Sequence, residues 1–185
     1  MVTALSSPRL SLGKATLDQI RAVLERETPA QSATLLREIG FAAGEALYEG
    51  FVESVSQRFG VETPQALDGR YLGDALAGFF REVGWGNLAT EAVAPGLLAI
   101  DSPDWVEAAP REATVPSCHF SCGMLSDLFT RLGGYPAAVM EVECRTRGEA
   151  RCRFLIGSPD LLTWLYEGIL AGTPYDRLVS TLRAG

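Results

Sequence analysis

Four cysteines lie in the C-terminal half of the chain, between residues 118 and 152. Cys144 and Cys152 flank the glycine of EVECRTRGEARCRF (141 to 154), while Cys118 and Cys122 open the stretch CHFSCGMLSDLFTRLGG. Thiols in this arrangement can be buried as small hydrophobic groups, can form a disulfide, or can bind zinc, whose tetrahedral sites often combine thiolates from two chain segments. The spacing of Cys144 and Cys152 is longer than that of a zinc knuckle, so spacing alone leaves these possibilities open.

The bulk composition limits what the cysteines can be doing. The chain has 185 residues, 47% of them hydrophobic and 21% charged, which suits one domain with a core that needs no disulfides. We expect a loose tail over residues 1–14 and a single domain over 15–185. No apolar run approaches the roughly 20 residues of a membrane span, and the N-terminus lacks a secretory signal. These features predict a cytoplasmic protein with reduced thiols, and the net charge of −7 argues against binding nucleic acid.

The N-terminal half is predicted to be helical. The stretch 16–27 places apolar residues on one face and starts with Thr16 as a capping residue. The stretch 28–60 has two adjoining apolar rows, with Gly40 and Gly44 one turn apart, where another helix can approach closely. We therefore expect a homodimer joined partly through this helix. A further helix is predicted over 63–84.

The C-terminal half alternates between predicted hairpins and helices. Residues 85–108 favour a hairpin that turns at Pro95-Gly96, 118–134 a helix, and 136–157 a second hairpin around Gly148. The last predicted helix is 158–172, with Ser158 as its cap. This order predicts the α+β class, an antiparallel sheet of about four strands covered by a layer of helices.

The cysteine-rich stretch resembles a known family. CHFSCGMLSDLFTRLGGYPAAVMEVECRTRGEARCRF is similar to the C-terminal signature of the 4-vinyl reductase (4VR) domain family, and GDALAGFFREVGWGNL resembles the preceding helix and strand. The resemblance covers roughly residues 30 to 157. It implies a fold shared with TRAPP vesicle-tethering subunits, usually homodimeric. In the aromatic-sensing members, input domains of transcriptional activators, the positions of Cys118, Glu141, Cys144 and Cys152 bind one zinc ion, so the resemblance implies a structural zinc here.

The fourth zinc ligand stays open at this stage. Glu141 and Cys144 would lie on opposite faces of a regular strand, so both can reach one metal only if the strand is bulged or twisted between them. Glu143, Cys122 and the single histidine, His119, are therefore alternatives. Three thiolates and a carboxylate on zinc leave a net charge near −2, which the arginines of the hairpin are close enough in sequence to offset: Arg145, Arg147, Arg151 and Arg153.

The resemblance also implies a pocket for a small hydrophobic ligand between sheet and helices. Its candidate lining residues are large apolar side chains and one thiol: Phe79, Phe80, Trp85, Trp105, Phe120, Cys122, Phe129 and Val139. Four protein ligands leave zinc no open position, and the sequence offers no catalytic triad, phosphate loop or nucleotide fingerprint. It therefore favours a non-enzymatic, stand-alone sensory or ligand-binding domain. The alternative is a scaffolding or accessory subunit that acts through protein contacts or in tetrapyrrole (bacteriochlorophyll) handling.

Overall fold

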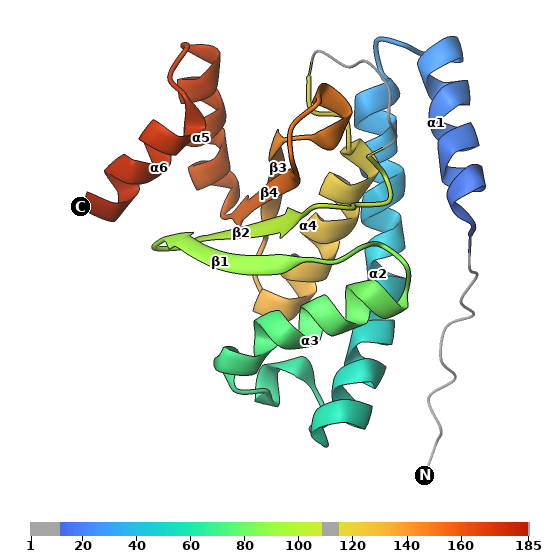
Figure 1. The fold of residues 1–185 in the computed structure, drawn as a ribbon, viewed down its shortest axis with the longest axis vertical. Coiled ribbons are helices and arrows are strands. Elements are labelled where there is room, and N and C mark those ends of the chain that lie inside the picture. The colour runs from blue at the N-terminus through green and yellow to red at the C-terminus, as the bar shows by residue number, and fades with distance from the viewer. Residues whose placement is uncertain (1–11, 109–114, 185) are drawn as a thin grey trace.

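The computed structural model describes residues 12–108 and 115–184, and most of the predicted N-terminal tail lies outside them. Four helices precede or follow the first hairpin on the same side of the sheet: α1 (Lys14–Glu27), α2 (Ser32–Phe59), α3 (Gly69–Glu82) and α4 (His119–Gly133). Two short 3-10 turns, Pro64–Ala66 and Arg145–Arg147, lie in connections. Figure 1 shows α2 and α4 running alongside each other, with α1 outside them.

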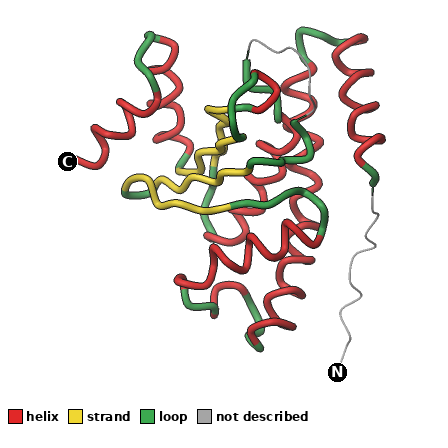
Figure 2. The backbone as a smooth tube through the Cα atoms, in the orientation of Figure 1, coloured by secondary structure: helices red, strands yellow, loops and turns green. Residues whose placement is uncertain are grey.

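The strands form one antiparallel sheet with the order β1-β2-β4-β3. Its members are β1 (Ala89–Ala94), β2 (Leu97–Ser102), β3 (Ala138–Glu143) and β4 (Cys152–Gly157). Each hairpin therefore contributes one inner strand and one edge strand, and the small sheet lies between helices (Figure 2). The predicted α+β class and four-stranded sheet are confirmed.

Alternation along the strands gives the sheet two apolar faces. Ile100 and Phe154 pack in the large core with α2, α3 and α4, whereas Ala99 and Leu155 pack in a smaller core with α5 (Pro159–Leu170) and α6 (Tyr175–Ala184). The sheet is thus covered on both faces. Ser158 caps α5 as predicted, by accepting a hydrogen bond from the Leu161 N–H. The helix α6 was not predicted.

The two glycines of α2 serve a contact inside the chain. A Cβ atom at Gly40 would lie 2.0 Å from the Phe120 carbonyl oxygen, and one at Gly44 would lie 2.5 Å from the Asp127 Cβ. From α4, Gly123 reciprocates, because a Cβ there would lie 1.9 Å from the Arg37 carbonyl oxygen. The prediction that these glycines admit a second chain is wrong, since the helix they admit is α4.

The start of the first helix also differs from the prediction. The helix begins at Lys14, and its N-cap is Gly13, which offers no side-chain hydrogen bond. Thr16 is therefore a residue of the first turn and not the cap. Among the described residues, no helix is both long and apolar enough to cross a membrane.

Candidate metal centre and aromatic core

Three thiols and one carboxylate meet where α4 begins against the β3–β4 hairpin. The ligand atoms of Cys118, Glu141, Cys144 and Cys152 all lie within 4.8 Å of one another, and all four residues are buried. The sulfur atoms of Cys118 and Cys144 are 3.9 Å apart. Tetrahedral zinc with bonds of about 2.3 Å to sulfur places two thiolates about 3.8 Å apart. The cluster therefore has the dimensions of a zinc site.

A strand bulge brings Glu141 and Cys144 to the same side. In the β3–β4 ladder, Glu141 pairs with Phe154 and Glu143 pairs with Arg153, so Val142 is the extra residue. The bulge reverses the alternation after Glu141 and directs Cys144 back toward α4. This is the irregularity that the sequence required if both residues were to reach one metal.

The carboxylate of Glu141 has one satisfied oxygen and one free oxygen. Oε2 accepts a hydrogen bond of 2.9 Å from the backbone N–H of Cys118, while Oε1 is buried without a partner. A buried carboxylate oxygen without a partner is costly unless a cation or donor meets it. Burial, followed by the nearby Cys144 sulfur, raises the pKa of Glu141 to about 8. The orphaned oxygen supports a cation at this point.

The thiols share protons unequally in the metal-free cluster. Hydrogen bonds from the thiols of Cys118 and Cys152 lower the pKa of Cys144, and the same contact with Cys144 raises the pKa of Cys118. Cys144 thus behaves as a thiolate that accepts from its two neighbours. Zinc would replace those shared protons with direct bonds to three sulfur atoms.

The alternative ligands lie elsewhere. Glu143 accepts hydrogen bonds from Arg151, with Arg151 Nε at 2.8 Å, and from the Tyr175 hydroxyl, so it does not reach the cluster. Cys122 is buried one turn further along α4 and is not one of the four clustered residues, nor is His119. Burial raises the pKa of the Cys122 thiol.

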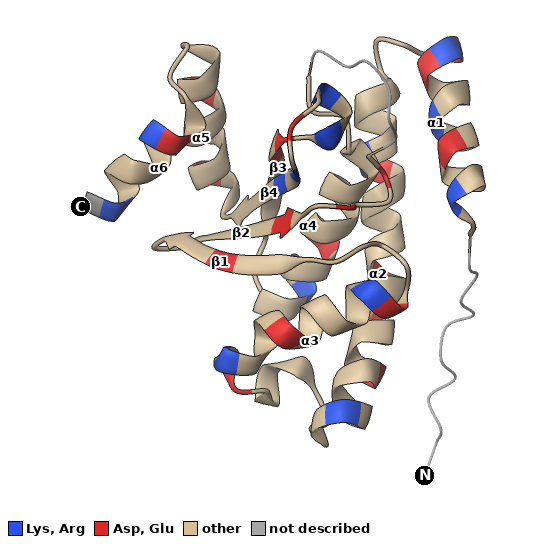
Figure 3. Ribbon diagram, in the orientation of Figure 1, with Lys and Arg blue, Asp and Glu red and all other residues tan. Residues whose placement is uncertain are grey.

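The hairpin arginines do not all offset the charge of the cluster. Arg151 forms ion pairs with Glu143 and, at 3.1 Å, with Asp101, while Arg153 bridges Asp101 and Glu91. Basic and acidic residues therefore accompany one another along the hairpin (Figure 3), and the predicted role in charge compensation is wrong for Arg151 and Arg153. Cys118, the N-cap of α4, lies instead at the positive end of a helix of 15 residues.

The predicted pocket residues form a packed aromatic core. The Trp85 ring stacks on Phe120 with 5.9 Å between centroids, and Trp105 lies 5.5 Å from Trp85 and 5.6 Å from Phe80. Phe79 and Phe80 meet edge to face, and Cys122 and Phe129 are buried in the same core. Val139 is the member of the predicted set that lines the largest groove of the described residues, which has a volume of about 850 Å³.

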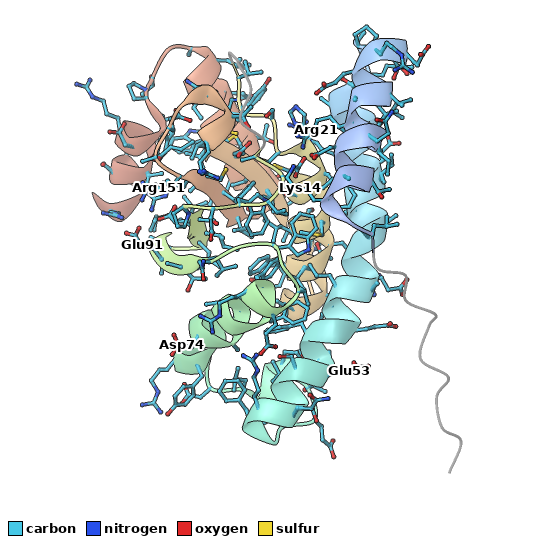
Figure 4. The ribbon with its side chains drawn as sticks, turned by 45° about the vertical axis from the view of Figure 1, so that its right-hand side comes forward. Lys14, Arg21, Glu53, Asp74, Glu91 and Arg151 are labelled. Atoms are coloured by element: carbon cyan, nitrogen blue, oxygen red, sulfur yellow. The ribbon has the colours of Figure 1, made fainter. Side chains whose placement is uncertain are left out.

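Sequence reasoning missed a buried charge network beside these rings. Glu107 is 1% exposed, and its carboxylate accepts hydrogen bonds from the backbone N–H groups of Phe120 (3.1 Å) and Ser121 (2.7 Å). Arg21, 2% exposed, reaches it from α1 and also donates to the Glu107 carbonyl oxygen at 3.0 Å (Figure 4). The Trp105 indole N–H donates to the Ser121 hydroxyl at 2.7 Å. Burial raises the pKa of Glu107, and the Arg21 charge opposes that rise.

These residues lie within the part of the chain that matches a known family. Residues 104–158 match the vinyl-4-reductase (4VR) domain family. The match contains all four clustered residues and confirms the resemblance predicted from the cysteine-rich stretch. A curated relative, the bacteriochlorophyll synthase 23 kDa chain of Cereibacter sphaeroides, is 30% identical over 135 residues, 68% of this chain and 61% of the relative. The chain thus spans less than two thirds of that relative's length.

Solved structures share the fold at low sequence identity. The phenol-responsive sensory domain of the transcription activator PoxR, crystallised with phenol, superposes with a TM-score of 0.61 and 19% identity over 91% of this chain and 83% of its own. A trafficking protein particle complex subunit 3 from Naegleria fowleri, covalently bound to palmitic acid, gives a TM-score of 0.59 and 12% identity over 78% of this chain and 93% of its own. The predicted TRAPP-like fold is therefore confirmed.

Proposed function

We propose that this domain binds a small aromatic or otherwise apolar molecule in its aromatic core, and that a structural zinc ion fixes the helix forming one wall of the binding region. The observation that carries the proposal is the first turn of α4. Cys118 belongs to the metal cluster, and Phe120 and Ser121, directly after it, belong to the aromatic core and its polar network. A metal at the cluster would therefore hold the wall on which a ligand rests.

Zinc is the metal that the donor set favours. Three thiolates and one carboxylate suit a borderline soft cation with tetrahedral geometry, and four protein ligands leave no position for a substrate. Cys118, Glu141, Cys144 and Cys152 would hold it, and its contribution would be a cross-link between α4 and the β3–β4 hairpin. The protein's own residues supply the remaining chemistry, which is binding.

The aromatic core offers a ligand both stacking surfaces and a polar anchor. Trp85, Trp105 and Phe120 present ring faces, and the Ser121 hydroxyl and the Glu107 carboxylate lie buried beside them. Aromatic molecules gain from offset or edge contacts with such rings, and a hydroxyl on the ligand gains a buried hydrogen-bonding partner. The shared fold with a phenol-responsive sensory domain supports this ligand class. Because the rings are packed together, they must separate to admit the ligand.

Phenol and toluene, which have nearly the same shape, test the proposal. Phenol should quench tryptophan fluorescence and stabilise the zinc-loaded protein by about 2.7 kcal/mol at a concentration of about one hundred times Kd, or a rise in Tm of roughly 5–11 °C. Toluene should bind less tightly, and Ser121→Ala should narrow the difference. Leu170→Ala, in the separate groove, should change neither affinity. If neither compound raises Tm or alters fluorescence, the ligand proposal fails.

A tetrapyrrole-related accessory role is the second candidate. Its support is the 30% identity to the bacteriochlorophyll synthase 23 kDa chain over 135 residues. Titration with magnesium protoporphyrin IX, followed by the shift of its Soret absorption band, distinguishes the two. Saturable binding with one porphyrin per chain or per dimer would favour the accessory role, and an unshifted band would remove it.

We also propose that the chain forms a homodimer through the outer face of α2. Ile39 and Phe41 are 40% and 47% exposed there, after the glycine face has packed on α4. Burial of such side chains in a partner would remove apolar surface from water. Ile39→Glu should convert a dimer to a monomer in sedimentation, while Glu53→Gln should not. A wild-type monomer at micromolar concentration would contradict the proposal.

A further inference from the structure

The two edges of the sheet differ in how they are covered. At the β1 edge, Arg183 from α6 donates a hydrogen bond to the Val93 carbonyl oxygen and also approaches Glu91 at 3.5 Å. At the other edge, β3 pairs with β4 alone, and no strand of the described ranges lies on its outer side. Exposed strand edges carry unpaired backbone groups, and proteins usually cover or charge them. The β3 edge is thus the open one.

The largest groove of the described residues follows this open edge. Its lining includes five consecutive residues of β3, from Ala138 to Val142. Successive side chains of a strand point to opposite faces, so a groove lined by all of them faces the backbone edge itself. Five residues at about 3.3 Å each give a length of roughly 16 Å, which accommodates an extended segment of similar length.

The walls of the groove are apolar. Leu162, Tyr166 and Leu170 of α5 line one side, and Val115 lines it beyond the strand. Tyr166 is 53% and Leu170 69% exposed, which is unusual for large apolar side chains next to one another along a helix. The first half of β3 and the two residues before it, PAAVM, contain no charged residue that would discourage strand pairing.

Positive charge gathers at one end of the groove. Arg147, which lines it, follows the C-terminal end of β3. Arg37 lines the same end, since its carbonyl oxygen lies beside Gly123 in α4 and the N-cap of α4, Cys118, donates to Glu141. Arg147 is already 3.6 Å from a carboxylate of Glu149, whereas Arg37 forms no ion pair within the described ranges.

We propose that the β3 edge binds an extended peptide that adds as a fifth strand, with apolar side chains against α5 and a carboxylate at Arg37. An added strand satisfies the free backbone groups of β3, whereas a purely apolar occupant such as an acyl chain would bury them unpaired. The carboxylate, from an acidic side chain or from the peptide's own terminus, matches the unpaired guanidinium. This binding site is separate from the aromatic core and does not depend on the ligand proposed there.

A selection from random peptides displayed with free C-termini, carried out on the zinc-loaded full chain, supplies the probe. Synthetic copies of the enriched peptides are then measured by fluorescence polarisation. Methylation of alternate backbone nitrogens should weaken binding by about tenfold or more, because each lost backbone hydrogen bond contributes about 1 kcal/mol. Arg37→Gln should abolish the preference for a carboxylate over its amide, and amidating only the C-terminus distinguishes the two sources of the carboxylate.

Charge on the strand edge provides the matched control. Met140→Lys should weaken peptide binding about tenfold or more, and Ala92→Lys on β1, the covered edge, should leave it within about twofold. Three results would overturn the proposal: no enrichment over a mock selection, equal affinity for methylated and unmethylated peptides, or a wild-type dimer that Met140→Lys dissociates. The last would assign the edge to a second copy of the chain. The first two readouts use the unaltered protein and need no variant to fold.

Discussion

Replacing Gly40 by alanine should separate α2 from α4 and disturb the metal cluster at the same time. The added Cβ would lie 2.0 Å from the Phe120 carbonyl oxygen, where real Cβ contacts stay above 3.0 Å. The neighbour is backbone, so no side-chain rotation relieves the clash, and α4 must withdraw by about 1 Å. Phe120 is two residues from Cys118, and metal bonds tolerate errors of only about 0.2 Å. We therefore expect both stability and zinc content to fall.

The size of the effect follows from the cost of overpacking. Inserting a methyl group into a tightly packed contact costs about 1–3 kcal/mol. For a chain of 185 residues this corresponds to a fall in Tm of roughly 2–12 °C. Thermal unfolding by circular dichroism measures the first quantity, and elemental analysis of the purified protein measures the second.

Gly69→Ala is the control for this prediction. Gly69 begins α3, and a Cβ there would have no heavy atom within 4 Å. Its replacement should leave zinc content unchanged and stability equal to or about 0.5 kcal/mol above the original. If Gly40→Ala behaved like Gly69→Ala, the close packing of α2 on α4 would be refuted. If it lowered Tm but kept full zinc content, the coupling of that packing to the cluster would be refuted.

Three further predictions concern the cluster and the buried charges. Cys144→Ser should lower zinc content and Tm together, while Cys122→Ser should preserve zinc content; equal losses in both would move a ligand onto the helix. Arg21→Met should cost about 3–5 kcal/mol in denaturant unfolding, because it leaves a buried carboxylate unpaired, whereas Arg70→Met in an exposed pair should cost less than about 1 kcal/mol. Zinc should bind more tightly as pH rises from 6 to 8, because the thiols must lose protons and the pKa of Glu141 is raised to about 8; calorimetry in buffers of different ionisation enthalpy should show proton release, and pH-independent affinity would contradict it.

Periodicity and turn residues were enough to predict most of the elements. Pro95-Gly96 and Gly148 mark the turns of the two hairpins, and Gly148 adopts a φ of 90°, which favours glycine. The association of Cys118 with the hairpin cysteines came from the family resemblance, since no local pattern relates a helix start to strands about 25 residues later. The bulge at Val142 was required by the alternation of the strand once Glu141 and Cys144 were assigned to one metal.

Long-range pairings could not be predicted. Arg21 and Glu107 are 86 residues apart and become partners only through the packing of α1 on the core. The hairpin arginines have equally good carboxylates in several directions, and only the fold brings Asp101 and Glu91 to Arg153. An apolar row on a helix likewise does not say which neighbour it meets, and for this reason the glycines of α2 were assigned to a second chain.

Extended X-ray absorption at the zinc K-edge of the purified protein tests the central claim most directly. The account predicts about one zinc per chain with three sulfur neighbours at about 2.3 Å and one oxygen neighbour at about 2.0–2.2 Å. A protein purified without zinc, or a zinc shell of nitrogen and oxygen without sulfur, would contradict it.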